Sequence, residues 1–177
     1  KALLTSGFSE KAKQEFSELL QRNPRYYPAR ISLIAKSLAD HQLSKAEFLL
    51  QQGLALAPNF MPYLKLQAVL YLRENKLPVA ISLLESHTPA MAHYPKYYGL
   101  LAGLYQKAHQ PKKAAALYQQ LLLVQPKNSV LWMALGLSFQ EQHQFEQARL
   151  AFQQALRGKR LSQPLQQFVE VRLRDLS

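Results

Sequence analysis

One alanine position recurs along this chain at a constant interval of 34 residues. The five copies are Ala12, Ala46, Ala80, Ala114 and Ala148. Four residues after each alanine stands a large apolar side chain, at Phe16, Leu50, Leu84, Tyr118 and Phe152. A period that holds over five copies without an insertion indicates stacked structural repeats. Since each such repeat packs only against its neighbours, we expect one continuous array.

The spacing within each copy predicts helices. Residues four apart lie on the same face of a helix, so the alanine lets a neighbouring helix approach closely and the larger residue fills the space beside it. Proline follows twelve residues after the alanine at Pro24, Pro58 and Pro126, with Ala92 and Arg160 in the other copies. Proline cannot continue a helix. Each unit is therefore predicted to be two helices followed by a stop, which makes the fold class all-α.

The later copies resemble the tetratricopeptide repeat (TPR), which has the same length. In the last copy the matching residues are Trp132, Leu135, Gly136, Phe139, Ala148, Phe152 and Ala155; in the preceding copy they are Tyr98, Leu101, Ala102, Tyr105, Ala114, Tyr118 and Pro126. Earlier copies depart from the signature, with Arg30 and Leu64 at the tryptophan position and His87 at that of the last alanine. The resemblance implies a right-handed TPR superhelix (α-solenoid) of antiparallel helix pairs.

The period also divides the chain. We predict a single TPR domain over residues 1–177, with a partial N-terminal repeat at 1–26, full repeats at 27–60, 61–94, 95–128 and 129–162, and a C-terminal capping helix at 163–177. Residues 1–6 are expected to be the rest of a helix, followed by a turn at Gly7, so we expect the chain to be part of a longer protein. In the second full repeat, His87-Thr88-Pro89 predicts an early helix end and a longer connection up to Tyr94.

The composition argues against catalysis. There is no cysteine, which removes disulfides, thiol nucleophiles and thiolate metal ligands, and no phosphate loop or nucleophile motif is present. Three histidines, at positions 41, 109 and 143, share one register with Asn75 at the turn inside each helix pair, where these residue types tolerate a left-handed backbone. Equivalent positions of stacked helices lie about 10 Å apart, too far to share a zinc ion. We expect no enzyme activity, no cofactor and no metal.

The TPR resemblance implies that the first helix of each repeat lines an inner groove. The predicted groove residues are Ile31, Leu38, Lys65, Val69, Leu72, Arg73, Lys96, Gly99, Gly103, Gln106, Lys107, Val130, Met133 and Leu137, with Ala35 and Gln140 beside them. This set is apolar and basic, and its two glycines would leave shallow depressions. It suits a protein or peptide segment that carries apolar anchors and acidic groups. The alternative is that these side chains only pack between neighbouring first helices.

A second class of partner is a polyanion. The chain has 22 basic and 11 acidic residues, a net charge of +11, and basic clusters occur at Lys107, Lys112 and Lys113 and at Arg157, Lys159 and Arg160. Neighbouring tyrosines, Tyr97, Tyr98 and Tyr105, would have to stack on bases. Tyr98 and Tyr105 occupy packing positions of the TPR signature, which places them in the core instead. Nucleic-acid binding is thus the secondary hypothesis.

Three stretches, at 46–58, 131–137 and 161–173, are also similar to the C-terminal repeat domains of a bacterial group, the MshN proteins of mannose-sensitive haemagglutinin (MSHA) pilus biogenesis. This resemblance implies a periplasmic domain, tethered through an upstream inner-membrane helix, that binds pilus assembly components. No stretch of this chain approaches the roughly 18 apolar residues of a membrane span. A cytoplasmic location, and a role as the regulatory arm of a larger enzyme, stay open as alternatives.

Overall fold

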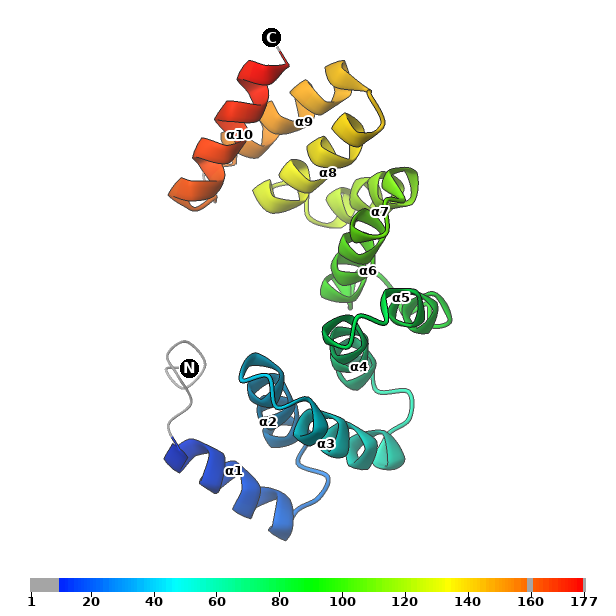
Figure 1. Cartoon of the computed structure of the whole chain (residues 1–177), viewed down its shortest axis with the longest axis vertical. Coiled ribbons are helices and arrows are strands. Elements are labelled where there is room, and N and C mark those ends of the chain that lie inside the picture. Colours follow the sequence, from blue (N-terminus) through cyan, green and yellow to red (C-terminus); the bar gives the residue numbers. More distant parts are fainter. Residues whose placement is uncertain (1–9, 159–160, 177) are drawn as a thin grey trace. The chain divides into compact units, whose positions relative to one another are not determined.

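A computed structural model describes residues 10–158 and 161–176, and these contain ten α-helices and no strand (Figure 1). In chain order the helices are α1 (Glu10–Arg22), α2 (Tyr27–Ala39), α3 (Leu43–Leu56), α4 (Met61–Arg73), α5 (Leu77–Glu85), α6 (Pro95–Lys107), α7 (Pro111–Val124), α8 (Ser129–Glu141), α9 (Phe145–Arg157) and α10 (Gln163–Asp175). The predicted all-α class is confirmed. The predicted helix end at residues 1–6 and the turn at Gly7 lie outside the described residues.

The recurring alanines are buried, as the interpretation of the repeat requires. Ala46, Ala80, Ala114 and Ala148 are each 0% exposed, and Ala12 is 5% exposed. A methyl group with no exposed surface is in contact with neighbouring helices on every side, so a larger side chain there would force the helices apart. The constant interval in the sequence therefore marks the points of closest helix packing.

The turns inside the helix pairs use a left-handed backbone at equivalent positions. His41, Asn75, His109 and His143 have φ angles of 57°, 59°, 52° and 58°. A side chain with a Cβ pays a steric cost in this region, and short polar or imidazole side chains are enriched there. The interpretation of these four residues as turn formers is confirmed.

Helix α5 ends early, as His87-Thr88-Pro89 predicted. It has 9 residues, whereas α3 and α7 have 14 and α9 has 13. The connection that follows is held by two tyrosines of α6: the Tyr97 hydroxyl donates to the carbonyl of His87 at 3.4 Å, and the Tyr98 hydroxyl donates to the carbonyl of Pro89. These bonds tie the start of the connection to the helix that comes after it.

The helices form two compact units, α1–α5 and α6–α10, which divide between Ser86 and His87. In the first unit α2 packs against α1, α3 and α4, and α4 packs against α5. Its core combines Ile34 and Leu38 of α2 with Leu50 of α3 and Tyr63 of α4. The rings of Tyr27, Phe60 and Tyr63 pack edge-on or tilted at the side of this core, with centroids 5.0–5.9 Å apart.

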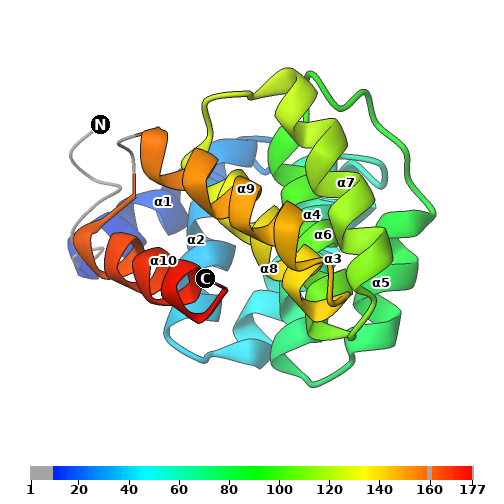
Figure 2. The same ribbon diagram turned by 90° about the horizontal axis from the view of Figure 1, so that it is seen from above.

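In the second unit each of α6, α7, α8 and α9 packs against the next helix, and α10 lies against α9 (Figure 2). Val169 of α10 is 0% exposed and joins a core cluster with Ala148 and Phe152 of α9. Leu165, Phe168 and Leu173 of α10 pack against the same cluster. Helix α10 thus covers the apolar side of the last helix pair, which is the role predicted for the capping helix.

Candidate partner-binding surface

The predicted inner-wall residues of the first unit form a connected surface on α2 and α4, which contact each other. Residues 34 apart occupy equivalent places, so Ile31 matches Lys65 and Ala35 matches Val69. Ile31 and Val69 are half-buried and pack against the core beneath, whereas Arg73 at the end of α4 is exposed. We name this surface the α2–α4 face; it consists of Ile31, Ala35, Lys65, Val69, Leu72 and Arg73.

Leu38 does not belong to that surface. Its side chain is only 4% exposed and lies in the core cluster with Ile34 of its own helix and with Ala46 and Leu50 of α3. A partner cannot reach it without opening this core. The repeat register places Leu38 correctly along the helix, but the packed core of α2, α3 and α4 encloses it.

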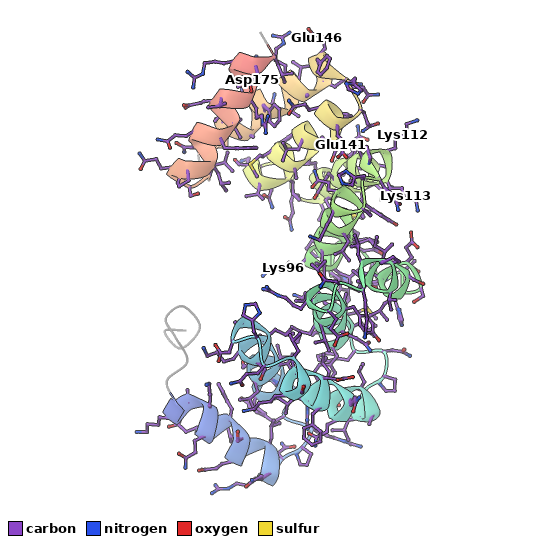
Figure 3. The ribbon with its side chains drawn as sticks, viewed as in Figure 1. Lys96, Lys112, Lys113, Glu141, Glu146 and Asp175 are labelled. Atoms are coloured by element: carbon purple, nitrogen blue, oxygen red, sulfur yellow. The ribbon has the colours of Figure 1, made fainter. Side chains whose placement is uncertain are left out.

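The corresponding surface of the second unit lies on α6 and α8. We name it the α6–α8 face; it consists of Lys96, Gly99, Gly103, Lys107, Val130, Met133 and Leu137. Lys96 and Lys107 are exposed, as is Val130 with 47% of its surface accessible. Figure 3 shows Lys96 extending from the start of α6, on the other side of the α6–α7 pair from Lys112 and Lys113.

The two glycines of this face are not required by packing. A Cβ placed on Gly99 would meet nothing within 4 Å, and one placed on Gly103 would meet only the hydroxyl of Tyr118 at 4.0 Å. Neither glycine has a positive φ. Both therefore leave helix backbone uncovered on a surface where alanine would fit.

Met133 and Leu137 form the half-buried end of the α6–α8 face. Both pack against the C-terminal core cluster, next to residues of α10. A partner can contact their outer edges only, so the more accessible part of the face is the stretch along α6 and the start of α8.

Gln106 has a structural role that its place in the sequence did not reveal. Its Nε2 donates to the carbonyl of Ala134 in α8 at 3.1 Å, and its Oε1 accepts from the Tyr118 hydroxyl of α7 at 2.7 Å. Burial raises the pKa of Tyr118 to about 12. Because both ends of the amide are engaged, Gln106 links three helices and is not available to a partner.

The basic residues outside these faces do not form a base-stacking platform. Lys113 lies over the ring of Tyr105, 5.1 Å from its centroid, and Tyr105 and Tyr97 are only 8% and 2% exposed. The acidic residues Glu141, Glu146 and Asp175 lie on the C-terminal helices α8, α9 and α10 (Figure 3). Oε1 of Glu141 lies 3.0 Å from Nδ1 of His109. Of the second basic cluster, Lys159 and Arg160 lie outside the described residues.

His41, His109 and His143 act as turn residues. Over residues 10–158 and 161–176, no group of three or more His, Cys, Asp or Glu side chains is arranged to hold a metal ion. In the same part of the chain, no helix combines the length and the apolar character that crossing a membrane requires.

A second structural role that sequence reasoning missed is that of Arg30, which replaces the signature tryptophan. Trp132 donates from Nε1 to the carbonyl of Pro126 at 2.8 Å. At the equivalent place Arg30 donates from Nη2 to the carbonyl of Pro24 at 3.1 Å. The arginine thus makes the hydrogen bond that the tryptophan makes, while bringing a charge into a position that is only 3% exposed.

Comparison with known proteins identifies the fold. No protein-family model matches the sequence, and a comparison with curated protein sequences finds no match. Among solved structures, PilF of Pseudomonas aeruginosa is similar over 91% of this chain and 73% of that one, with a TM-score of 0.78 and 14% identity. A TPR protein of Thermus thermophilus is similar over 93% and 88% of the two chains, with a TM-score of 0.66 and 18% identity.

A third similar structure is YrrB, described as a TPR protein with an unusual peptide-binding site. It is similar over 81% of this chain and 74% of that one, with a TM-score of 0.64 and 14% identity. At these identities the comparisons establish the architecture alone. The chain has the helix-pair fold of the TPR solenoids, as its sequence predicted.

Proposed function

We propose that this protein is a non-catalytic scaffold whose α2–α4 face and α6–α8 face each bind a segment of another protein. The observation that carries the proposal is the character of these faces. They present partly exposed apolar residues such as Ile31, Val69 and Val130 beside exposed cations, and no acidic residue is among the residues that define them.

The glycines of α6 support binding rather than packing. A glycine inside a helix costs about 1 kcal/mol relative to alanine. At Gly99 and Gly103 packing does not require glycine, because the methyl group of an alanine would fit without a steric clash. A bare stretch of helix does allow a partner backbone to approach closely, so the two glycines fit a surface that is occupied in the complex.

The charges indicate what the partner carries. Within the described residues, Arg73, Lys96 and Lys107 form no ion pair. Exposed, uncompensated cations beside apolar contacts attract a segment with acidic side chains and speed its association. The peptide-binding site named for YrrB, a protein of the same fold, supports a peptide partner for this chain too.

For the cellular setting we propose a periplasmic domain of an MshN-like protein, anchored in the inner membrane by a segment upstream of this chain and assisting assembly of an MSHA-like type IV pilus. The support is the similarity of the three stretches at 46–58, 131–137 and 161–173 to that group. A chain without cysteine is compatible with an oxidising compartment. Deleting the domain in the native host should abolish surface pili. Normal piliation would refute the proposed role in pilus assembly, without contradicting the proposal that the domain is a scaffold.

Site-specific photo-crosslinking tests the scaffold proposal. A photoreactive amino acid at Gly99, on the α6–α8 face, should capture a defined partner in host cells. The same residue at the exposed Ala116 of α7 is the matched control. With that partner purified, the double variant Lys96→Glu and Lys107→Glu should bind about tenfold or more weakly, a loss of about 1.4 kcal/mol, while Lys112→Glu binds normally. Equal capture from both positions, or unchanged binding by the double variant, would refute the proposal.

The net charge of +11 keeps polyanion binding as a second candidate. A nucleic-acid binder would show oligonucleotide affinity that falls steeply as salt rises, because phosphate contacts release counterions. The buried Tyr97 and Tyr105 cannot contribute stacking. A titration at low salt that shows no binding disposes of this candidate.

A further inference from the structure

A crevice of about 700 Å³ is lined by residues of α1, α2 and α3, three helices that follow one another in the first unit (Figure 1). It lies within the first unit and is separate from the α2–α4 face. Its apolar lining includes Leu20 of α1, Leu33 of α2 and Phe48 of α3, whose ring is 58% exposed. The remaining lining residues are Ser17, Gln21, Pro24, Arg30, Leu49, Gln52, Ala55 and Leu56.

Among the described residues that line the crevice, Arg30 alone is charged, and within that same part of the chain it forms no ion pair. Its guanidinium donates to Oε1 of Gln52 at 2.7 Å and to the carbonyl of Pro24 at 3.1 Å. Both acceptors are neutral, and no carboxylate of the described residues pairs with it. A guanidinium has five N–H donors, so three donors remain, including a buried Nε without a hydrogen-bond partner.

The side of Arg30 away from the crevice is tightly packed. Tyr63 lies against it: the buried Tyr63 hydroxyl is close enough to interact with the guanidinium, although it makes no hydrogen bond of ordinary geometry. A Cβ on Gly53 would come within 2.9 Å of the Arg30 Cδ and 2.8 Å of the Tyr63 ring. These contacts hold the guanidinium in place on the side away from the crevice. Gln52 is the neighbour that can move, because its side chain is exposed.

The fold itself does not require this charge. At the equivalent place in the second unit, Trp132 makes the same hydrogen bond to a proline carbonyl and lines a crevice of about 550 Å³ between α7, α8 and α9. None of the described residues that line that crevice is charged, and Leu150 stands at the place of Phe48. Burying a cation among neutral groups costs free energy unless it is paired. A ligand that supplies the missing anion explains why an arginine stands in the first crevice.

We propose that the α1–α3 crevice binds an apolar segment of a partner protein through one side-chain carboxylate, which pairs with Arg30. The carboxylate takes the place of the Gln52 Oε1, and the Gln52 amide turns to donate to its second oxygen. Apolar residues on either side of the acid pack on Leu20, Leu33 and Phe48. The lining spans about one turn of α1, from Ser17 to Gln21, and about two turns of α3, from Phe48 to Leu56, a trough on the order of 10 Å long on its longer side, which suits an internal segment. This site does not depend on the α2–α4 or α6–α8 faces.

The first measurement uses the unmodified protein. The probe is an acetylated and amidated octapeptide with leucines around one glutamate, and its control has glutamine at the same place. In ¹⁵N NMR at about 0.15 M salt, where long-range attraction is screened, the glutamate peptide should shift the Arg30 Nε–H signal and the glutamine peptide should not. An unmoved Arg30 signal overturns the proposal.

The second measurement uses variants that keep the fold. Arg30→Trp copies the residue of the other crevice and keeps a donor for the Pro24 carbonyl, so it should fold and melt no lower than wild type. We expect it to bind the glutamate peptide about tenfold or more weakly, a difference of about 1.4 kcal/mol. Arg22→Gln removes the same charge from an exposed position outside the crevice and should bind as wild type does.

Three outcomes would overturn the proposal. Equal losses in Arg30→Trp and Arg22→Gln would show a nonspecific attraction by net charge. Equal binding of the glutamate and glutamine peptides would show an apolar crevice without a role for the guanidinium. Tighter binding of a peptide with a free C-terminus and no glutamate would assign the site to a terminal carboxylate.

Discussion

Replacing glycine by alanine should have opposite effects at two helical positions of the second unit. Gly99 of α6 and Gly136 of α8 are both inside helices, so alanine gains about 1 kcal/mol of helix propensity at either place. A Cβ on Gly99 would meet nothing within 4 Å. A Cβ on Gly136 would lie 2.6 Å and 2.7 Å from two ring atoms of Phe152, whose side chain is 0% exposed. Only the first position has room for the methyl group.

The magnitudes follow from these contacts. Gly99→Ala should stabilise the protein by up to about 1 kcal/mol. Gly136→Ala gains the same propensity but overpacks a core site, which costs about 1–3 kcal/mol. We use the upper part of that range, because the Phe152 ring is enclosed and cannot move aside. The expected net effect is a loss of about 1–2 kcal/mol, so the two variants should differ by about 2–3 kcal/mol.

Urea unfolding followed by far-ultraviolet circular dichroism measures this difference, with equal m values showing that only stability has changed. Gly103→Ala is the control, because its Cβ would meet only the Tyr118 hydroxyl at the ordinary distance of 4.0 Å; it should behave like Gly99→Ala. If Gly136→Ala proved as stable as Gly99→Ala, the close packing of Gly136 on Phe152 would be refuted.

Three further predictions concern a cap, a turn and a buried tyrosine. Asn128→Ala should lower stability by about 1 kcal/mol, measured by urea unfolding, because its side chain accepts from the backbone N–H groups of Val130 and Leu131 at the start of α8; no loss would contradict the cap. His143→Val should be less stable than His143→Asn, because φ is 58° there and a β-branched residue tolerates it poorly; equal melting temperatures would refute this. Burial raises the pKa of Tyr118 from 10.0 to about 12, so its contribution to stability is fully present below pH 10 and is lost as pH rises to about 12. The melting temperature of wild type should thus fall more steeply over that range than that of Tyr118→Phe, and parallel curves would show that Tyr118 ionises without penalty.

Much of the fold was predictable because its determinants are local in the chain. The alanine interval identifies the points of helix contact, and the histidine and asparagine turns follow from the conformational preferences of single residues. The early end of α5 follows from Pro89 and the residues just before it, since proline and its predecessor avoid continued helix. Such features depend on residues a few positions apart, so a single sequence is enough to find them.

The surface was harder to predict, because exposure depends on the neighbouring helix. Leu38 and Leu72 occupy equivalent places, yet Leu38 lies in the core cluster and is 4% exposed while Leu72 is half-buried. Gln106 has the polarity of a surface residue, but its amide joins α6 to α7 and α8. Register shows which side of a helix a residue is on, and only the packed neighbours decide what remains accessible.

The amino-acid sequence by itself determined the all-helical TPR fold, the turns inside the helix pairs and the early end of α5, because periodicity and backbone preference are properties of the chain. Only the tertiary structure showed that Arg30 takes over the hydrogen bond of the signature tryptophan and lies without a counter-ion in an apolar crevice. The physical reason is that the environment of a buried charge is built from separate helices: α1 supplies the crevice wall, α3 supplies Gln52 and α4 supplies Tyr63. The packing of these helices decides which side chains surround Arg30, and the spacing of residues along the chain does not show it.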